Sequence, residues 1–95
     1  MRYTASFQVI PIQTKNLTEV IDNVVDVIKS SGLKYEVNAH STIVEGEKDA
    51  LLRLLERIIK ECESISERCV VSFQMDLKKG GVSIDDKVSK YRMGS

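Results

Sequence analysis

The sequence predicts a single α+β domain over residues 1–95, with elements in the order βαββαβ and a short helix after the last strand. Three observations support this prediction. Two segments repeat apolar residues with the spacing of one helix face. A third segment alternates apolar and polar residues, as a strand with one buried face does. A chain of 95 residues is also the size of one domain rather than two.

The first half of the pattern is a strand followed by a helix. Residues Thr4 to Ile12 are rich in strand formers, and a polar connection is expected from Gln13 to Asn16. Asn16 is a suitable N-cap, with Glu19 as the second member of a capping box. Gly32 is expected to end the helix. The apolar residues of this helix lie on one face: Leu17, Val20, Ile21, Val24, Val25 and Ile28.

Two short strands and a second helix follow. Tyr35 to Val37 and Thr42 to Glu45 are the expected strands, joined by a turn at residues 38–41, and Gly46 is expected to break the second of them. A helix is predicted from Lys48 to Cys62. Its apolar residues have the same spacing as those of the first helix: Leu51, Leu54, Leu55, Ile58, Ile59 and Cys62.

The last strand, Arg68 to Leu77, has the clearest alternation in the chain. Beyond it, Ser83 is expected to cap a short helix, with Asp86 completing the capping box. Met93 to Ser95 are expected to fray. Two β-α-β halves with matching helices indicate a ferredoxin-like fold. Right-handed crossovers would place both long helices on one face of the sheet.

The alternation in the strands predicts which residues face the helices and which face away. Ala5, Phe7 and Val9 match the buried row of the last strand, which is Cys69, Val71, Phe73, Met75 and Leu77. The opposite, helix-free face would carry small polar groups and a few aliphatic ones: Ser6, Gln8, Ile10, Ile12, Ser72, Gln74 and Asp76. Since aliphatic residues there would otherwise be exposed, we expect this face to pair with a second copy as a dimer or tetramer. A cleft between two such faces would suit a small ligand.

Composition disfavours several classes of function. The formal net charge is +0, whereas a nucleic-acid-binding protein usually has a basic excess. No apolar stretch is long enough to span a bilayer, and the first residues do not resemble a signal peptide. We therefore expect a cytoplasmic protein without a nucleic-acid or membrane partner. Cys62, Cys69 and His40 are too few for a closed zinc site, so two free thiols are expected, although a disulfide between them stays open.

The sequence contains few residues in arrangements that indicate chemistry. It has no phosphate-binding glycine loop, no local signature of a nucleophile with its base, and no required cofactor. Glu45 ends a strand beside Gly46, so it is either a solvated carboxylate or a ligand-binding group. His40 lies in the turn, where an exposed residue is the more common interpretation. These observations favour a binding protein over an enzyme.

Several segments in this order and spacing resemble a known family. They are Ser6 to Ile12 (SFQVIPI), Ser31 to Tyr35 (SGLKY), Thr42 to Glu47 (TIVEGE, with a T-x-x-E-G signature) and Arg68 to Val70 (RCV). The chain is similar to small thiamine-binding proteins, the single-domain relatives of YkoF-like thiamine or hydroxymethylpyrimidine binders. The resemblance implies a ferredoxin-like fold, assembly into dimers or tetramers, and non-catalytic ligand binding at a subunit interface. Residues 39–41, which read Pro-Met-Gly in that family's usual pattern, are Ala-His-Ser in this chain.

The expected ligand site therefore lies on the helix-free face. Glu45 is the expected polar anchor for an aminopyrimidine, Ser6 and Thr42 orient it with their hydroxyls, Ser72 shares the face, and Ile10 is an apolar wall. Two other functions stay open at this point. The chain could be an interaction module that binds no ligand, or an enzyme that uses Glu45 and His40.

Overall fold

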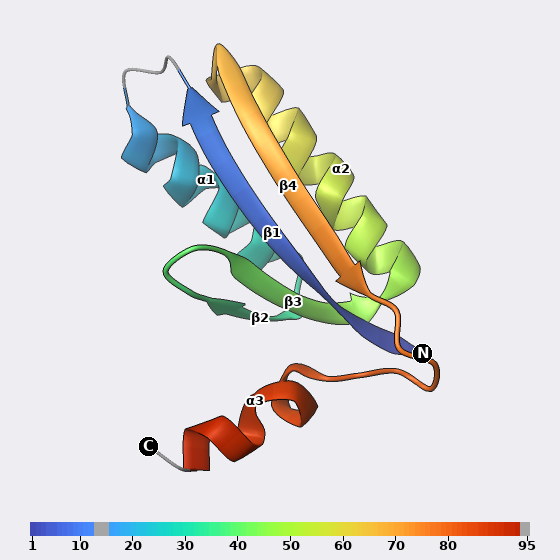
Figure 1. Cartoon of the computed structure of the whole chain (residues 1–95). Helices are drawn as coiled ribbons and strands as arrows, with labels where there is room; N and C mark the ends of the chain where they lie inside the picture. The colour runs from blue at the N-terminus through green and yellow to red at the C-terminus, as the bar shows by residue number, and fades with distance from the viewer. Residues whose placement is uncertain (13–15, 94–95) are drawn as a thin grey trace.

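The computed structural model describes residues 1–12 and 16–93, which form a four-stranded sheet and three helices (Figure 1). The elements are β1 (Arg2–Ile12), α1 (Leu17–Ser30), β2 (Lys34–Val37), β3 (Thr42–Glu47), α2 (Lys48–Ile65), β4 (Arg68–Asp76) and α3 (Ile84–Met93). The strand order is β2-β3-β1-β4, and neighbouring strands are antiparallel. The predicted ferredoxin-like fold is confirmed. The fraying expected from Met93 is not found at Met93 itself, which is the last residue of α3. The connection expected at residues 13–15 and the fraying expected at residues 94–95 lie outside the described residues.

Helix α1 begins at the predicted cap. The Asn16 side chain accepts a hydrogen bond from the Glu19 N–H at 3.1 Å. The Glu19 carboxylate accepts a hydrogen bond from the side-chain amide of Asn16, whereas in a standard capping box it would accept from the backbone N–H of the N-cap residue. At the other end Gly32 has a positive φ of 77°, as expected after a helix. Helix α2 continues past Cys62 to Ile65, and Ser66 ends it by donating its hydroxyl to the Cys62 carbonyl at 2.7 Å.

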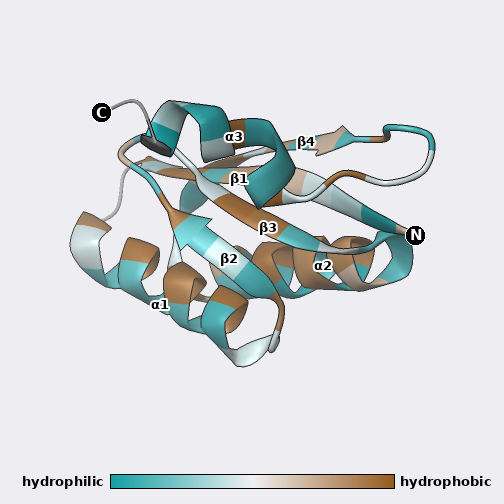
Figure 2. Ribbon diagram, turned by 90° about the horizontal axis from the view of Figure 1, so that it is seen from below, coloured by the Kyte–Doolittle hydropathy of each residue, from teal (hydrophilic) through white to brown (hydrophobic). Residues whose placement is uncertain are grey.

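The core lies between α1, α2 and one face of the sheet. Apolar residues of both helices face the sheet in Figure 2. Phe7 on β1 and Phe73 on β4 meet there, with ring centroids 5.0 Å apart. The predicted inward row of β4 is confirmed from Cys69 to Met75, whereas Leu77 lies beyond the strand and is 62% exposed. The most deeply buried side chains are Ile28, Val44, Leu51, Leu54 and Ile58.

Gly46 does not break β3, which continues to Glu47. The backbone of Gly46 pairs with Tyr3, and the residue is buried on the helix side of the sheet. A Cβ atom at Gly46 would lie 3.2 Å from Leu33 Cδ2. The glycine therefore permits close packing of Leu33 on the strand, which is one of the ordinary reasons for glycine within a sheet.

The face opposite α1 and α2 is not free of helices along its whole length. Helix α3 lies across the end of it that carries Thr4, Glu45 and Asp76 (Figure 2). Ser83 caps α3 as predicted: its hydroxyl accepts from the Asp86 N–H at 2.9 Å, and the Asp86 carboxylate accepts from the Ser83 N–H at 3.2 Å. The expectation of a helix-free face is thus wrong at this end, and holds for the part around Ser6 to Ile10.

Ion pairs attach α3 to the sheet. Lys34 on β2 binds Asp85 at 2.6 Å, Lys87 binds Asp76 on β4 at 2.7 Å, and Arg92 binds Glu36 on β2 at 2.6 Å. The hydrogen bond from Lys34 lowers the pKa of Asp85 below its ordinary value. The stabilisation from this pair is therefore complete above the ordinary carboxyl pKa and is lost as the pH falls through the lowered one. Its contribution is small, because both side chains are exposed.

Candidate functional site

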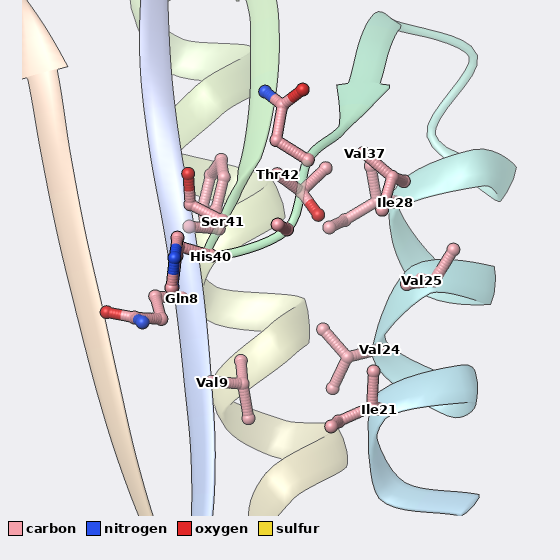
Figure 3. Close-up of a pocket in the computed structure, with 13 residues that line it drawn as sticks. Gln8, Val9, Ile21, Val24, Val25, Ile28, Val37, His40, Ser41 and Thr42 are labelled. Carbon is pink, nitrogen blue, oxygen red and sulfur yellow. The ribbon is translucent and has the colours of Figure 1, made fainter. Parts of the chain in front are cut away.

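A hollow opens between α1 and β1 on the helix side of the sheet (Figure 3). We call it the α1 hollow. It exists because β3 pairs with β1 only as far as Phe7–Thr42, whereas β1 continues to Ile12. Its volume is about 240 Å³. The residues that line it come from β1, from α1 and from the β2–β3 connection: Phe7, Gln8, Val9, Ile21, Val24, Val25, Ile28, Val37, Asn38, Ala39, His40, Ser41 and Thr42.

The α1 hollow is apolar along α1 and polar beside the turn. Val24 and Ile28 form the wall on the helix side and Val9 forms the wall on β1, with their side chains directed between helix and strand in Figure 3. Thr42 is 8% exposed. Within residues 1–12 and 16–93 its hydroxyl has no hydrogen-bond partner, so it can donate to a ligand and accept from one. An apolar slot with a few polar groups at one end is the usual form of a small-molecule site.

A second hollow lies on the other face of the sheet, over β1 and β4. We call it the open-face hollow. Its volume is about 540 Å³. Ser6 and Ser72 both line it, as expected, because Ser6 pairs with Gln74 and Ser72 pairs with Gln8 across the two strands. Its lining is mostly polar: Ser6, Gln8, His40, Ser41, Ser72, Phe73 and Gln74.

The two hollows share part of their lining. Gln8, His40 and Ser41 line both of them. The turn at residues 38–41 therefore lies where the two hollows approach each other, at the point where β3 begins and β1, beyond Phe7, is paired only with β4.

Glu45 lies elsewhere and has other partners. It is 7% exposed and lies under the start of α3, where Oε1 accepts a hydrogen bond from the Ile84 N–H at 2.8 Å. Its Oε2 accepts from Arg2 Nε at 3.2 Å. A carboxylate at the N-terminus of a helix is also favoured by the helix dipole. Glu45 lines neither the α1 hollow nor the open-face hollow.

The structure therefore does not bring Thr42 and Glu45 together. Three positions apart on one strand, they lie on opposite faces of the sheet, Thr42 toward α1 and Glu45 toward α3. This separation was available from the sequence, since residues an odd number apart in a strand always point to opposite faces.

Ser6 and Ser72 share the open face with Ile10, which is 44% exposed and pairs with Val70. Ile10 lines neither hollow.

Comparison with known proteins supports a binding function. The family model described as thiamine-binding protein matches residues 5–92. The chain belongs to the thiamine-binding protein family. A UPF0045 protein of Clostridium perfringens is 39% identical over 89 residues, which cover 92% of this chain and 94% of that protein.

Solved structures of relatives share the fold of this thiamine-binding family member. A candidate thiamine biosynthesis/salvage protein of Thermotoga maritima has a TM-score of 0.90 and 38% identity, covering 97% of this chain and 100% of that one. A Bacillus cereus domain of unknown function (DUF77) has a TM-score of 0.88, also at 38% identity, covering 97% and 91%. A Streptococcus pneumoniae protein, at 24% identity over 94% and 99%, has a TM-score of 0.81 and shows the same fold.

The structure adds residues to the candidate site of this thiamine-binding family member. From the sequence, these residues were not expected to contact a ligand. The α1 residues Val24 and Ile28 were predicted as core, and they are core residues that also form a wall of the hollow. His40 was expected to be an exposed turn residue, and it is exposed while lining both hollows. The only feature of the sequence that could have indicated the α1 hollow was a first predicted strand much longer than the third.

The described part of this family member contains neither a candidate metal-binding cluster nor a helix that could span a membrane. Among residues 1–12 and 16–93, no three acidic, histidine or cysteine side chains are grouped so that they could hold a metal ion. None of the helices in these ranges is both long and apolar enough to cross a bilayer. His40 lines both hollows and Glu45 lines neither, so the structure does not bring together the two residues named in the enzyme alternative.

Proposed function

We propose that this protein binds thiamine or its hydroxymethylpyrimidine part, without catalysing a reaction on it. The observation that carries the proposal is the α1 hollow, an apolar slot with the unpartnered Thr42 hydroxyl at one end, in a member of the thiamine-binding family. The name of the Thermotoga maritima relative, which refers to thiamine biosynthesis or salvage, supports the same ligand class.

In this proposal the aminopyrimidine ring occupies the α1 hollow. Its flat apolar faces contact Val9 on one side and Val24 and Ile28 on the other, which removes apolar surface from water on both partners. The ring nitrogen and the exocyclic amine are an acceptor and a donor. The hydroxyl of Thr42 can serve either of them, because a hydroxyl both donates and accepts.

The thiazolium part of thiamine extends past His40 and Ser41 toward the open-face hollow. Ser6 and Ser72 supply hydroxyl groups there. Hydroxymethylpyrimidine lacks this second ring, so it uses the α1 hollow alone. The two ligands therefore separate the contributions of the two hollows.

Removing the Thr42 hydroxyl should weaken binding of both ligands. Thr42→Val keeps the shape of the side chain, and we expect affinity to fall about five-fold, the effect of one hydrogen bond worth about 1 kcal/mol. Ser6→Ala combined with Ser72→Ala should weaken the binding of thiamine and leave the affinity for hydroxymethylpyrimidine unchanged. Isothermal titration calorimetry with each ligand measures both effects.

The pattern of losses decides between the two locations. If Thr42→Val binds both ligands with wild-type affinity while the double serine variant loses both, the ligand lies wholly on the open face. If wild-type protein, folded and free of ligand at the start, gives no heat with either compound, the proposed function is wrong. The alternative of an interaction module without a ligand would then take its place.

We also propose that the exposed part of the open face pairs with a second copy of the chain. Ile10 and Val70 pair across β1 and β4, and they are 44% and 43% exposed, so an apolar patch lies beside the open-face hollow. Ile10→Glu should shift a dimer or tetramer to the monomer, because it would bury a charge at the contact. Light scattering measures the mass, and Ile59→Glu, on α2 and 40% exposed, is the matched control away from this patch. An unchanged mass for Ile10→Glu would place the contact elsewhere.

A further inference from the structure

The chain contains two cysteines, and the fold brings them together. Cys62 lies near the end of α2 and Cys69 near the start of β4, so the chain reverses direction between them. Cys62 is 3% exposed and belongs to the core, and Cys69 is partly buried and packs against the same core. Both are free thiols.

Two further observations place the sulfur atoms next to each other and within reach of solvent. Cys69 is close enough to Cys62 to contribute, after burial, to the raised pKa of the Cys62 thiol. Both cysteines also line one hollow of about 320 Å³ at the surface, between the end of α2 and the start of β4. Arg68 lines the same hollow, together with Glu63 and Glu67. A small solute that enters this hollow can reach the more exposed Cys69, and the buried Cys62 belongs to the same lining.

We propose that Cys62 and Cys69 form a thiol–disulfide exchange site that takes low-molecular-weight disulfides as its oxidant. In the first step the thiolate of Cys69 attacks one sulfur of the small disulfide, forms a mixed disulfide and releases one small thiolate, which takes up a proton. In the second step Cys62 loses its proton and attacks the Cys69 sulfur, releasing the second small thiol. Two protein thiols thus become one disulfide, and the small disulfide is reduced to two thiols.

The environment of the two sulfurs sets the order of these steps. Burial, followed by the proximity of Cys69, raises the pKa of the Cys62 thiol to about 12. Cys62 therefore stays protonated at neutral pH, and the more exposed Cys69 attacks first.

The disulfide would join the end of α2 directly to β4. This cross-link lies on the helix side of the sheet, far along β4 from the α3 end, and it uses none of the residues that line the α1 hollow or the open-face hollow. The exchange site therefore goes beyond the proposed function and can be tested without thiamine.

The test is incubation of the reduced full chain with glutathione disulfide, followed by unfolding, alkylation of free thiols and intact-mass analysis. We expect wild-type protein to lose two hydrogens, take up no alkyl group and regain two reactive thiols after reduction. The oxidised protein should stay at the monomer mass, and its melting temperature should rise. A wild-type protein that keeps two free thiols, or that carries a glutathione on each cysteine, would overturn the proposal.

Single variants test the order of the steps. Cys62→Ala should trap one glutathione on Cys69, because the second thiol is missing. Cys69→Ala should take up none, since Cys62 is buried. Equal labelling of the two variants would contradict the assignment of Cys69 as the attacking thiol. The intact wild-type mass still tests the disulfide itself if either variant folds poorly.

Discussion

Replacing Glu45 by alanine should detach α3 from the sheet and cost about 3 kcal/mol of unfolding free energy. Glu45 is 7% exposed and accepts from the Ile84 N–H at 2.8 Å. A hydrogen bond to a charged group contributes about 1.5–3 kcal/mol, and this loss sets the size of the effect. The ion pair with Arg2 adds little, since the Arg2 side chain is 53% exposed.

Urea unfolding measures the stability change, and hydrogen exchange of the α3 amides measures the detachment. Glu45→Gln is the matched control, because an amide oxygen can still accept from the Ile84 N–H. It should lose only about 1 kcal/mol and keep α3 protected. The same variant tests the role expected from the sequence. If Glu45→Gln folds normally but binds thiamine much more weakly, Glu45 is a ligand anchor after all, and our assignment of it to α3 is wrong.

Most of the fold was predictable because each element has a local pattern that agrees with its packing. The helix-face spacing of α1 and α2 and the alternation of β4 each reflect one buried face, and the structure buries those faces. The caps at Asn16 and Ser83 were predictable for the same reason, since each side chain satisfies N–H groups within its own helix.

The errors have a common cause, which is contact between distant parts of the chain. Gly46 was read as the end of a strand, because glycine often interrupts one. Only the structure shows that Leu33, in the connection between α1 and β2, packs closely against it. Leu77 continued the alternation of β4 by residue type. The strand ends one residue earlier at Asp76, which pairs with Thr4 and binds Lys87 of α3.

The candidate site was only partly predictable. Ser6 and Ser72 were placed together correctly from alternation alone. The position of α3 could not be predicted, because its ion pairs reach residues far away in sequence, such as Lys34 and Glu36. The α1 hollow depends on the unequal lengths of β1 and β3, and strand ends are the least certain part of any prediction from sequence.

Filling the α1 hollow should abolish binding of both thiamine and hydroxymethylpyrimidine. Val24 is 5% exposed and its side chain lies in the wall of the hollow (Figure 3). In Val24→Phe the larger ring would occupy the space of about 240 Å³ that we assign to the pyrimidine. We expect affinity to fall by about 100-fold or more, since a ligand would have to displace a packed aromatic side chain. Calorimetry with both ligands measures the loss.

The same substitution should not unfold the protein, because it fills existing space rather than overpacking the core. Cavity-filling changes commonly add about 0.5–2 kcal/mol of stability, whereas forcing extra atoms into a full core costs about 1–3 kcal/mol. Val27→Phe is the matched control: Val27 is on the same helix and packs against the core, but it does not line the hollow. It should keep binding and lose stability. If Val24→Phe binds thiamine normally and melts below wild type, the hollow is part of the core and the ligand lies on the open face.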